Sequence, residues 1–232
     1  INVNGVRQTI DLCRRFGAAL IHVSTCFVAG NRDGEVYEDE EVIGYFPRRP
    51  GLNRPHGHDR RRPQLSELRD ADFSAEAEVA DCERLIAQVK ARADDRAHVS
   101  LFRDRGAQRL KKEGRDPDDE RHLKAAVQRE RKLWLSEELT ELGMERARHW
   151  GWPNTYTYTK SLGDQLCALA ASRPGPDGKT LKVAIVRPAI VESAVSYPFP
   201  GWNEGFNTTA PLIFMVLRGH QQVPAGKDSV LD

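Results

Sequence analysis

The sequence predicts an α/β protein with a partial, doubly wound parallel sheet and a long helical insertion. Two helix–strand units carry this prediction, one near each end of the 232-residue chain. A highly charged segment with helical periodicity separates them. Helices that alternate with apolar strands are typical of a parallel sheet, and such sheets bind ligands at the carboxyl ends of their strands.

The first unit is a predicted helix over residues 3–16 followed by a strand over 18–23. Apolar residues recur at spacings of three and four along the helix, as expected for an amphipathic helix (Val3, Val6, Ile10 and Cys13). Phe16-Gly17 is a typical helix end. The strand reads AALIHV, which predicts burial on both faces. Ser24 and Thr25 follow it directly.

The second unit is a predicted helix over residues 154–171 and a strand over 180–187. The helix carries a stripe of leucines, and Pro174 to Gly178 form a turn after it. The strand reads TLKVAIVR and is ended by Pro188. We therefore expect the sheet to resume here.

The segment between the two units is predicted to be a loop followed by charged helices. Residues 47–63 are rich in arginine, proline and glycine, which favours a solvated loop, although arginines also suit phosphate recognition. Helices are predicted over 74–95, with Ser74 as N-cap, and over 118–149. Such a long insertion costs little loop-closure free energy and often forms a lid or a packing surface.

These observations divide the chain into three parts. Residues 1–36 are predicted to form the first part of the sheet core, and 37–149 the loop and helical insertion. Residues 150–232 are predicted to form the second part of the core and the start of a substrate-binding region.

Composition narrows the class of protein. The formal net charge is +1, which gives no reason to expect a nucleic-acid partner. The four cysteines are scattered without metal-ligand spacing, which argues against a zinc site or a disulfide framework and favours a cytoplasmic setting (Cys13, Cys26, Cys82 and Cys167). No apolar stretch approaches the ~20 residues that span a bilayer.

The strongest chemical signal is the pair Tyr156 and Lys160 on the second predicted helix. Residues four apart lie on one helix face, so the phenol and the ammonium point into the same space. A tyrosine alone, with a pKa near ~10, is a poor proton donor at neutral pH, but a neighbouring ammonium lowers that pKa. Taken alone, the spacing is equally compatible with a surface pair.

The position of Ser24 and Thr25 bears on whether Tyr156 and Lys160 form an active site. Ser24 and Thr25 follow a predicted parallel strand, where a hydroxyl could stabilise the oxyanion that develops on a substrate carbonyl. A strand-end hydroxyl can equally cap the next turn. The tyrosine–lysine pair and the strand-end hydroxyls belong to the same predicted sheet, and their combination favours a catalytic role for these residues.

Three motifs resemble the extended short-chain dehydrogenase/reductases, a Rossmann-like superfamily: HVSTCFVAG at 22–30, YTYTK at 156–160 and VRPAIV at 186–191. Two longer stretches are similar to the fatty acyl-CoA reductases of the male-sterility type. They are GWPNTYTYTKSLGDQL at 151–166 and IVRPAIVESAVSYPFPGWNEG at 185–205. The resemblance covers roughly half of the chain, and the predicted insertion matches only in position and helical character.

The resemblance implies roles for particular residues. Thr25, with Ser24 beside it, would polarise the substrate carbonyl, and Tyr156 would be the general acid. Lys160 would support Tyr156 and bind the cofactor ribose. The remaining implied contacts are Asn2 as support for the lysine through water, the Pro188, Ala189 and Ile190 backbone at the nicotinamide, and Trp202 on the acyl side.

The resemblance also implies a reaction: hydride transfer from NADPH to the thioester carbonyl of a long-chain acyl-CoA, giving an aldehyde, a primary alcohol or both. One departure is clear, because no GxxGxxG phosphate loop occurs in the sequence. We therefore expect residues 1–232 alone to bind a dinucleotide poorly and to be inactive. Peripheral membrane association and a homo-oligomer stay open.

Two alternatives remain. Another extended family member would act on a carrier-protein thioester or a nucleotide sugar. A non-catalytic module would use the α/β part only to support the charged helices.

Overall fold

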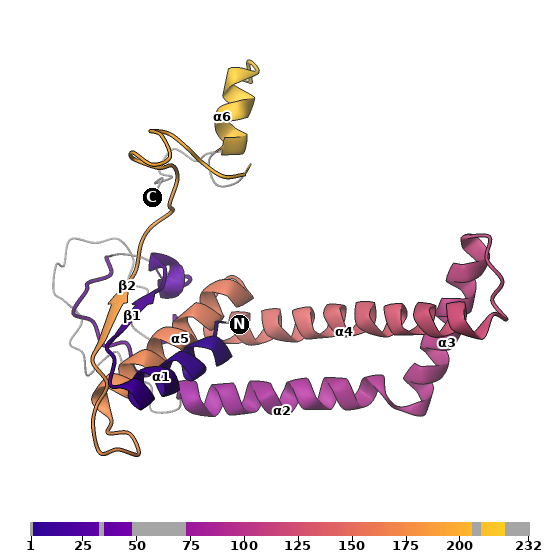
Figure 1. The fold of residues 1–232 in the computed structure, drawn as a ribbon, viewed down its shortest axis with the longest axis horizontal. Coiled ribbons are helices and arrows are strands. Elements are labelled where there is room, and N and C mark those ends of the chain that lie inside the picture. Colours follow the sequence, from indigo (N-terminus) through magenta and orange to yellow (C-terminus); the bar gives the residue numbers. More distant parts are fainter. Residues whose placement is uncertain (1, 33–34, 48–72, 206–209, 221–232) are drawn as a thin grey trace.

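The computed structural model describes residues 2–32, 35–47, 73–205 and 210–220. The predicted arginine loop, with its suggested phosphate contacts, lies largely outside these ranges. Within the described residues the chain forms an α/β part and three long helices that project from it (Figure 1).

The α/β part is built from the two predicted units. Helix α1 (Asn4–Phe16) precedes strand β1 (Leu20–Val23), and helix α5 (Thr155–Ser172) precedes strand β2 (Val183–Val186). Gly17 ends α1 in the left-handed conformation, with φ of 64°, as the Phe16-Gly17 signal predicts. The two units are therefore confirmed, with bounds within a few residues of the expected ones.

Strands β1 and β2 pair in parallel, with Leu20 opposite Val183 and Val23 opposite Val186. Within the described residues these two strands form the whole sheet, which is parallel, as the alternation of helices and strands predicts. Helices α1 and α5 pack against it and close a small core of apolar side chains (Ile10, Cys13, Leu20, Cys167, Ala170 and Leu181).

The prediction that the first strand is buried on both faces is wrong for the described residues. Leu20 is 8% exposed, whereas Ile21 is 71% and Val23 61% exposed. Successive side chains of a strand point to opposite faces, and both packing helices cover the face of Leu20. The opposite face of β1 therefore lies open in this part of the chain.

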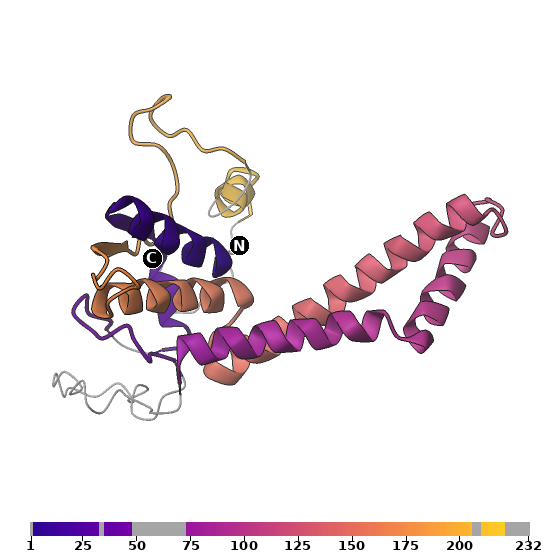
Figure 2. The same cartoon turned by 60° about the horizontal axis from the view of Figure 1, so that its bottom comes forward.

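Between the two units, the described part of the sequence forms three helices: α2 (Ala75–Ala93), α3 (Arg96–Lys112) and α4 (Glu120–Trp150). We call them the helical arm. Figures 1 and 2 show the arm extending away from the sheet, with α3 at its far end. Its own core includes Phe102 and Trp134. Whether the arm is an insertion relative to related proteins stays a prediction.

Local sequence features account for the start of α2 and for the buried positions of α3. The Ser74 hydroxyl accepts a hydrogen bond from the Ala77 amide at 3.4 Å, so the predicted N-cap of α2 is confirmed. Helix α3 was not predicted as a helix, because its only apolar stripe is short. Phe102, Gly106 and Leu110 recur every four residues and are the buried positions of α3.

A second apolar cluster joins the base of the arm to α5. It contains Phe46, Phe73, Ala147, Trp152 and Leu162. Beyond β2 the chain leads to the short helix α6 (Ala210–Leu217), none of whose residues is buried. Within the described ranges, every helix is too short or too polar to cross a bilayer.

Candidate active site

Helix α5 carries both Tyr156 and Lys160. The Asn154 side chain starts the helix by accepting a hydrogen bond from the Thr157 amide at 2.9 Å. Tyr156 lies in the first turn and is 54% exposed. The Lys160 ammonium donates to the Val23 carbonyl at 2.6 Å. The lysine charge therefore lies at the carboxyl end of β1, one helical turn from the phenol.

Ser24 and Thr25 are buried at the same strand end, at 5% and 6% exposure. The Thr25 hydroxyl oxygen accepts a 3.3 Å hydrogen bond from the Phe27 amide and so caps the short helix η1 (Cys26–Ala29). This is the capping role that the sequence allowed, and it leaves the hydroxyl proton available. The Ser24 hydroxyl has no hydrogen-bond partner among the described residues.

An unpartnered buried hydroxyl costs about 1–3 kcal/mol. Such a group commonly marks a place where a ligand or water completes the hydrogen bonding. Lys160 can also donate three hydrogen bonds and uses one of them on Val23. Both groups thus have hydrogen-bonding capacity left for a polar ligand at this edge.

The end of β2 lies against the same loop. The Ser24 amide donates to the Val186 carbonyl at 2.7 Å, and the Cys26 amide donates to the Pro188 carbonyl at 3.0 Å. Pro188 is half-buried, whereas Ala189 and Ile190 are exposed. The structure thus brings the segment from 188 to 190 beside the residues that follow β1.

Of two other residues with predicted roles, Asn2 lies next to Lys160, whereas Trp202 makes no described contact with Tyr156. The Asn2 side chain donates to the Thr159 hydroxyl at 3.0 Å, next to Lys160 on α5. Trp202 lies in the loop after β2, where its backbone carbonyl accepts from the Ala194 amide at 2.7 Å. Its side chain is 37% exposed, and no described contact joins it to Tyr156.

The turn after Thr25 is held by Trp152 and Tyr45, whose roles no sequence pattern predicted. The Trp152 indole is fully buried and donates to the Val28 carbonyl at 2.8 Å. The Tyr45 hydroxyl donates to the Ala29 carbonyl at 2.6 Å, and burial raises the pKa of Tyr45 to about 12. The only sequence signal for Trp152 was its place in the WPNTY stretch.

Gly30 ends this turn with φ of 66°. A Cβ atom there would lie 2.4 Å from the Pro47 side chain and 2.9 Å from Trp152. A larger residue would therefore push the turn away from Trp152 and strain the backbone.

Tyr158 competes with Tyr156 as a candidate acid but is held elsewhere. It is 3% exposed and donates a very short hydrogen bond to Glu78 of α2, while the Cys82 sulfur lies 3.3 Å from its hydroxyl. Burial and these partners raise the pKa of Tyr158 far above its usual range. Arg146 of α4 neutralises Glu78. Tyr158 therefore links α5 to the arm and is a poor proton donor to a substrate.

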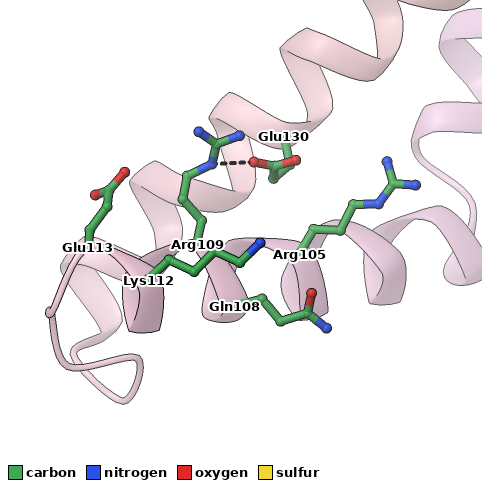
Figure 3. Close-up of a pocket in the computed structure, with 6 residues that line it drawn as sticks. All are labelled: Arg105, Gln108, Arg109, Lys112, Glu113 and Glu130. Carbon is green, nitrogen blue, oxygen red and sulfur yellow. Dashed lines mark hydrogen bonds and ion pairs between the residues drawn. The ribbon is translucent and has the colours of Figure 1, made fainter.

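A cavity of about 390 Å³ lies at the far end of the arm, between α3 and α4 (Figure 3). Its lining is charged or polar: Arg105, Gln108, Arg109, Lys112, Glu113 and Glu130. The Arg109 side chain donates to Glu130 across it at 2.5 Å. Such a lining does not suit an acyl chain, and the arm carries the cavity away from α5 (Figure 1).

Rossmann-like domains bind their nucleotides at the carboxyl ends of parallel strands, which is where the polar groups gather in this sheet. A model of the NAD-binding family described as male sterility protein matches residues 1–231. The chain belongs to this family.

The curated relatives support the same assignment. The chain is 40% identical over 210 residues to the alcohol-forming fatty acyl-CoA reductase of Simmondsia chinensis, covering 90% of this chain and 30% of that protein. It is 43% identical over 81 residues to the probable fatty acyl-CoA reductase 5 of Arabidopsis thaliana, covering 35% and 15%. It is 26% identical over 200 residues to the putative fatty acyl-CoA reductase 7 of that plant, covering 86% and 34%. The chain thus spans at most about a third of these relatives.

Proposed function

We propose that the protein reduces a long-chain fatty acyl-CoA with NADPH, and that this chain contributes the catalytic edge of the sheet. One observation carries the proposal. The Lys160 ammonium lies at the end of β1, beside the buried hydroxyls of Ser24 and Thr25, and one helical turn from the exposed Tyr156. The relatives' names supply the substrate class.

Each residue of this group has a distinct proposed task. Thr25 donates a hydrogen bond to the thioester oxygen, since its own oxygen already accepts from Phe27. Tyr156 protonates the same oxygen, and Lys160 favours the transfer by stabilising the phenolate that remains. Ser24 supports the same substrate or the cofactor with its free hydroxyl.

The cofactor has a matching set of groups. Lys160 keeps donors free for ribose hydroxyls. The backbone from Pro188 to Ile190 is proposed to meet the nicotinamide carboxamide, and because the Pro188 carbonyl already accepts from the Cys26 amide, Ala189 and Ile190 would make the contacts. When bound, NADPH supplies a hydride to the thioester carbon. Cleavage of the C–S bond then releases coenzyme A and leaves an aldehyde, and a second reduction would give a primary alcohol.

The proposed division of the chain follows from these roles. Residues 1–36 and 150–232 form the sheet core with its catalytic edge and the start of the substrate region, and 37–149 hold the arm. Trp202 is proposed to line the acyl side because it follows β2 at the same end of the sheet.

The full-length protein tests the proposal. NADPH oxidation is followed with palmitoyl-CoA, with the same acyl group on a carrier protein, and with UDP-glucose. We expect consumption of NADPH and release of free thiol with acyl-CoA, and a fatty aldehyde or alcohol by mass spectrometry. Turnover with only the carrier-bound chain or the nucleotide sugar would reject the acyl-CoA assignment. Absence of NADPH oxidation with all three would favour the non-catalytic module.

A further inference from the structure

Asp164 is a fully buried carboxylate on α5, one helical turn after Lys160. One of its oxygens, Oδ2, accepts a 2.8 Å hydrogen bond from Arg187 Nε. The other, Oδ1, lies 3.2 Å from His22 Nε2. A single side chain of α5 thus accepts a hydrogen bond from the residue that follows β2 and lies close to His22 of β1, without a hydrogen bond to it.

The contact with Arg187 lies directly before the 188–190 segment that is proposed to bind the cofactor. His22 belongs to β1, and Arg187 stands directly after β2 and before Pro188. The Pro188 carbonyl in turn accepts from the Cys26 amide at 3.0 Å. The position of Arg187 therefore sets where the 188–190 backbone leaves the sheet.

Lys160 and Asp164 each join α5 to the end of one strand. Residues four apart lie on one face of α5, and here that face meets the sheet. Lys160 binds the end of β1 through the Val23 carbonyl, and Asp164 binds the end of β2 through Arg187. The helix that carries Tyr156 is thus fixed to both strand ends.

Simple packing does not account for this arrangement. Burying a carboxylate with its partner rarely gains stability over apolar residues of similar size, because both charges lose their hydration. Asp164 is 0% exposed, and the Arg187 side chain is 27% exposed. A buried ion pair of this kind can fix the relative position of the elements that it joins, here α5 and the end of β2.

We propose that Asp164 is a positioning residue: through Arg187 it holds the 188–190 backbone in place to receive the nicotinamide. This inference rests on the proposed function and deepens it. It requires that loss of the ion pair weakens cofactor binding more than it affects the acyl-CoA.

The test compares Asp164→Asn, Arg187→Gln and the double variant in the full-length protein. The Kd of NADPH is measured by fluorescence titration without acyl-CoA, and KM values for both substrates by steady-state kinetics. We expect each single variant to raise the Kd of NADPH about tenfold or more, and the double variant to bind no more weakly than the weaker single variant. The KM for palmitoyl-CoA should stay within about twofold, because the coupling is local.

Glu78→Gln is the matched control, because Glu78 is also a buried carboxylate paired with an arginine and bonded to α5 through Tyr158. It should lower the melting temperature without changing the Kd of NADPH. An unchanged Kd in Arg187→Gln, or an equal rise in Glu78→Gln, would overturn the inference. Arg187→Gln decides the matter if Asp164→Asn does not fold, because Arg187 is partly exposed. A wild-type protein that fails to bind NADPH would instead refute the proposed function.

Discussion

The ammonium of Lys160 donates a 2.6 Å hydrogen bond to the carbonyl of Val23, the last residue of β1. Val23 and Lys160 are separated by 137 positions in the sequence. The contact places a positive charge at the end of the strand, where Ser24 and Thr25 are buried. It connects the two halves of the proposed active site.

Lys160→Met should abolish most of the activity. The substitution keeps the apolar stem of the side chain but removes the charge and leaves the Val23 carbonyl without its donor. In the full-length protein we expect kcat/KM to fall by about a hundredfold or more, with a higher Kd for NADPH.

The exposed Lys179 provides the control, because its ammonium makes no hydrogen bond or ion pair among the described residues. Lys179→Met should have near wild-type kinetics. Equal rates for the two variants would remove Lys160 from the mechanism.

Trp152→Phe should destabilise the turn after β1. The variant keeps an aromatic ring but leaves the Val28 carbonyl without its indole donor. We expect a loss of about 1–3 kcal/mol in the free energy of unfolding, measured by urea denaturation.

Trp150→Phe is a suitable comparison for this loss. Trp150 packs on Phe46 and Phe73, but its indole nitrogen makes no hydrogen bond among the described residues. Its replacement should therefore cost less than that of Trp152. A loss as large as that of Trp152→Phe would show that the Val28 hydrogen bond contributes nothing specific.

Sequence periodicity predicted the helices that have a continuous apolar stripe. The expected helix over 74–95 is α2, and that over 118–149 is α4, because their apolar residues recur over many turns. Helix α3 lacks such a stripe, and its buried positions are Phe102, Gly106 and Leu110. It also contacts α4 through side chains that no apolar periodicity marks, such as His98 on Trp134 and Arg109 on Glu130.

The site was only partly predictable, for a physical reason. The spacing of Tyr156 and Lys160 is a local property of one helix and is visible in the sequence. The bonds from Trp152 to Val28 and from Arg187 to Asp164 join different elements, 124 and 23 positions apart. No periodicity reports such pairs, so their roles emerge only from the fold.

The start of helix α4 should be sensitive to acid. The Asp119 carboxylate accepts hydrogen bonds from the amides of His122 and Arg121, and chiefly the bond from His122 lowers the pKa of Asp119 below its usual value. A lowered folded-state pKa means that the cap stabilises fully above the unfolded pKa of ~3.9 and is lost as the pH falls through the folded value.

Asp119→Asn keeps a capping oxygen that does not titrate. The melting temperature of the wild type should therefore exceed that of the variant at pH 7, and this difference should vanish as the pH falls below ~4. Asp118→Asn removes a neighbouring carboxylate that accepts no described hydrogen bond and should show no such trend. A difference that is constant from pH 7 to acid would contradict the role of the Asp119 charge.

The most direct measurement compares Tyr156→Phe with Tyr158→Phe in a single turnover of the full-length protein with NADPH and palmitoyl-CoA. Tyr158 is buried against Glu78, so its variant should lose stability but reduce the thioester at nearly the wild-type rate. Tyr156→Phe should bind NADPH normally and react about 10²- to 10⁴-fold more slowly, because it lacks the proton that the oxyanion requires. A Tyr156→Phe rate within about threefold of wild type would contradict the assignment of Tyr156 as the general acid.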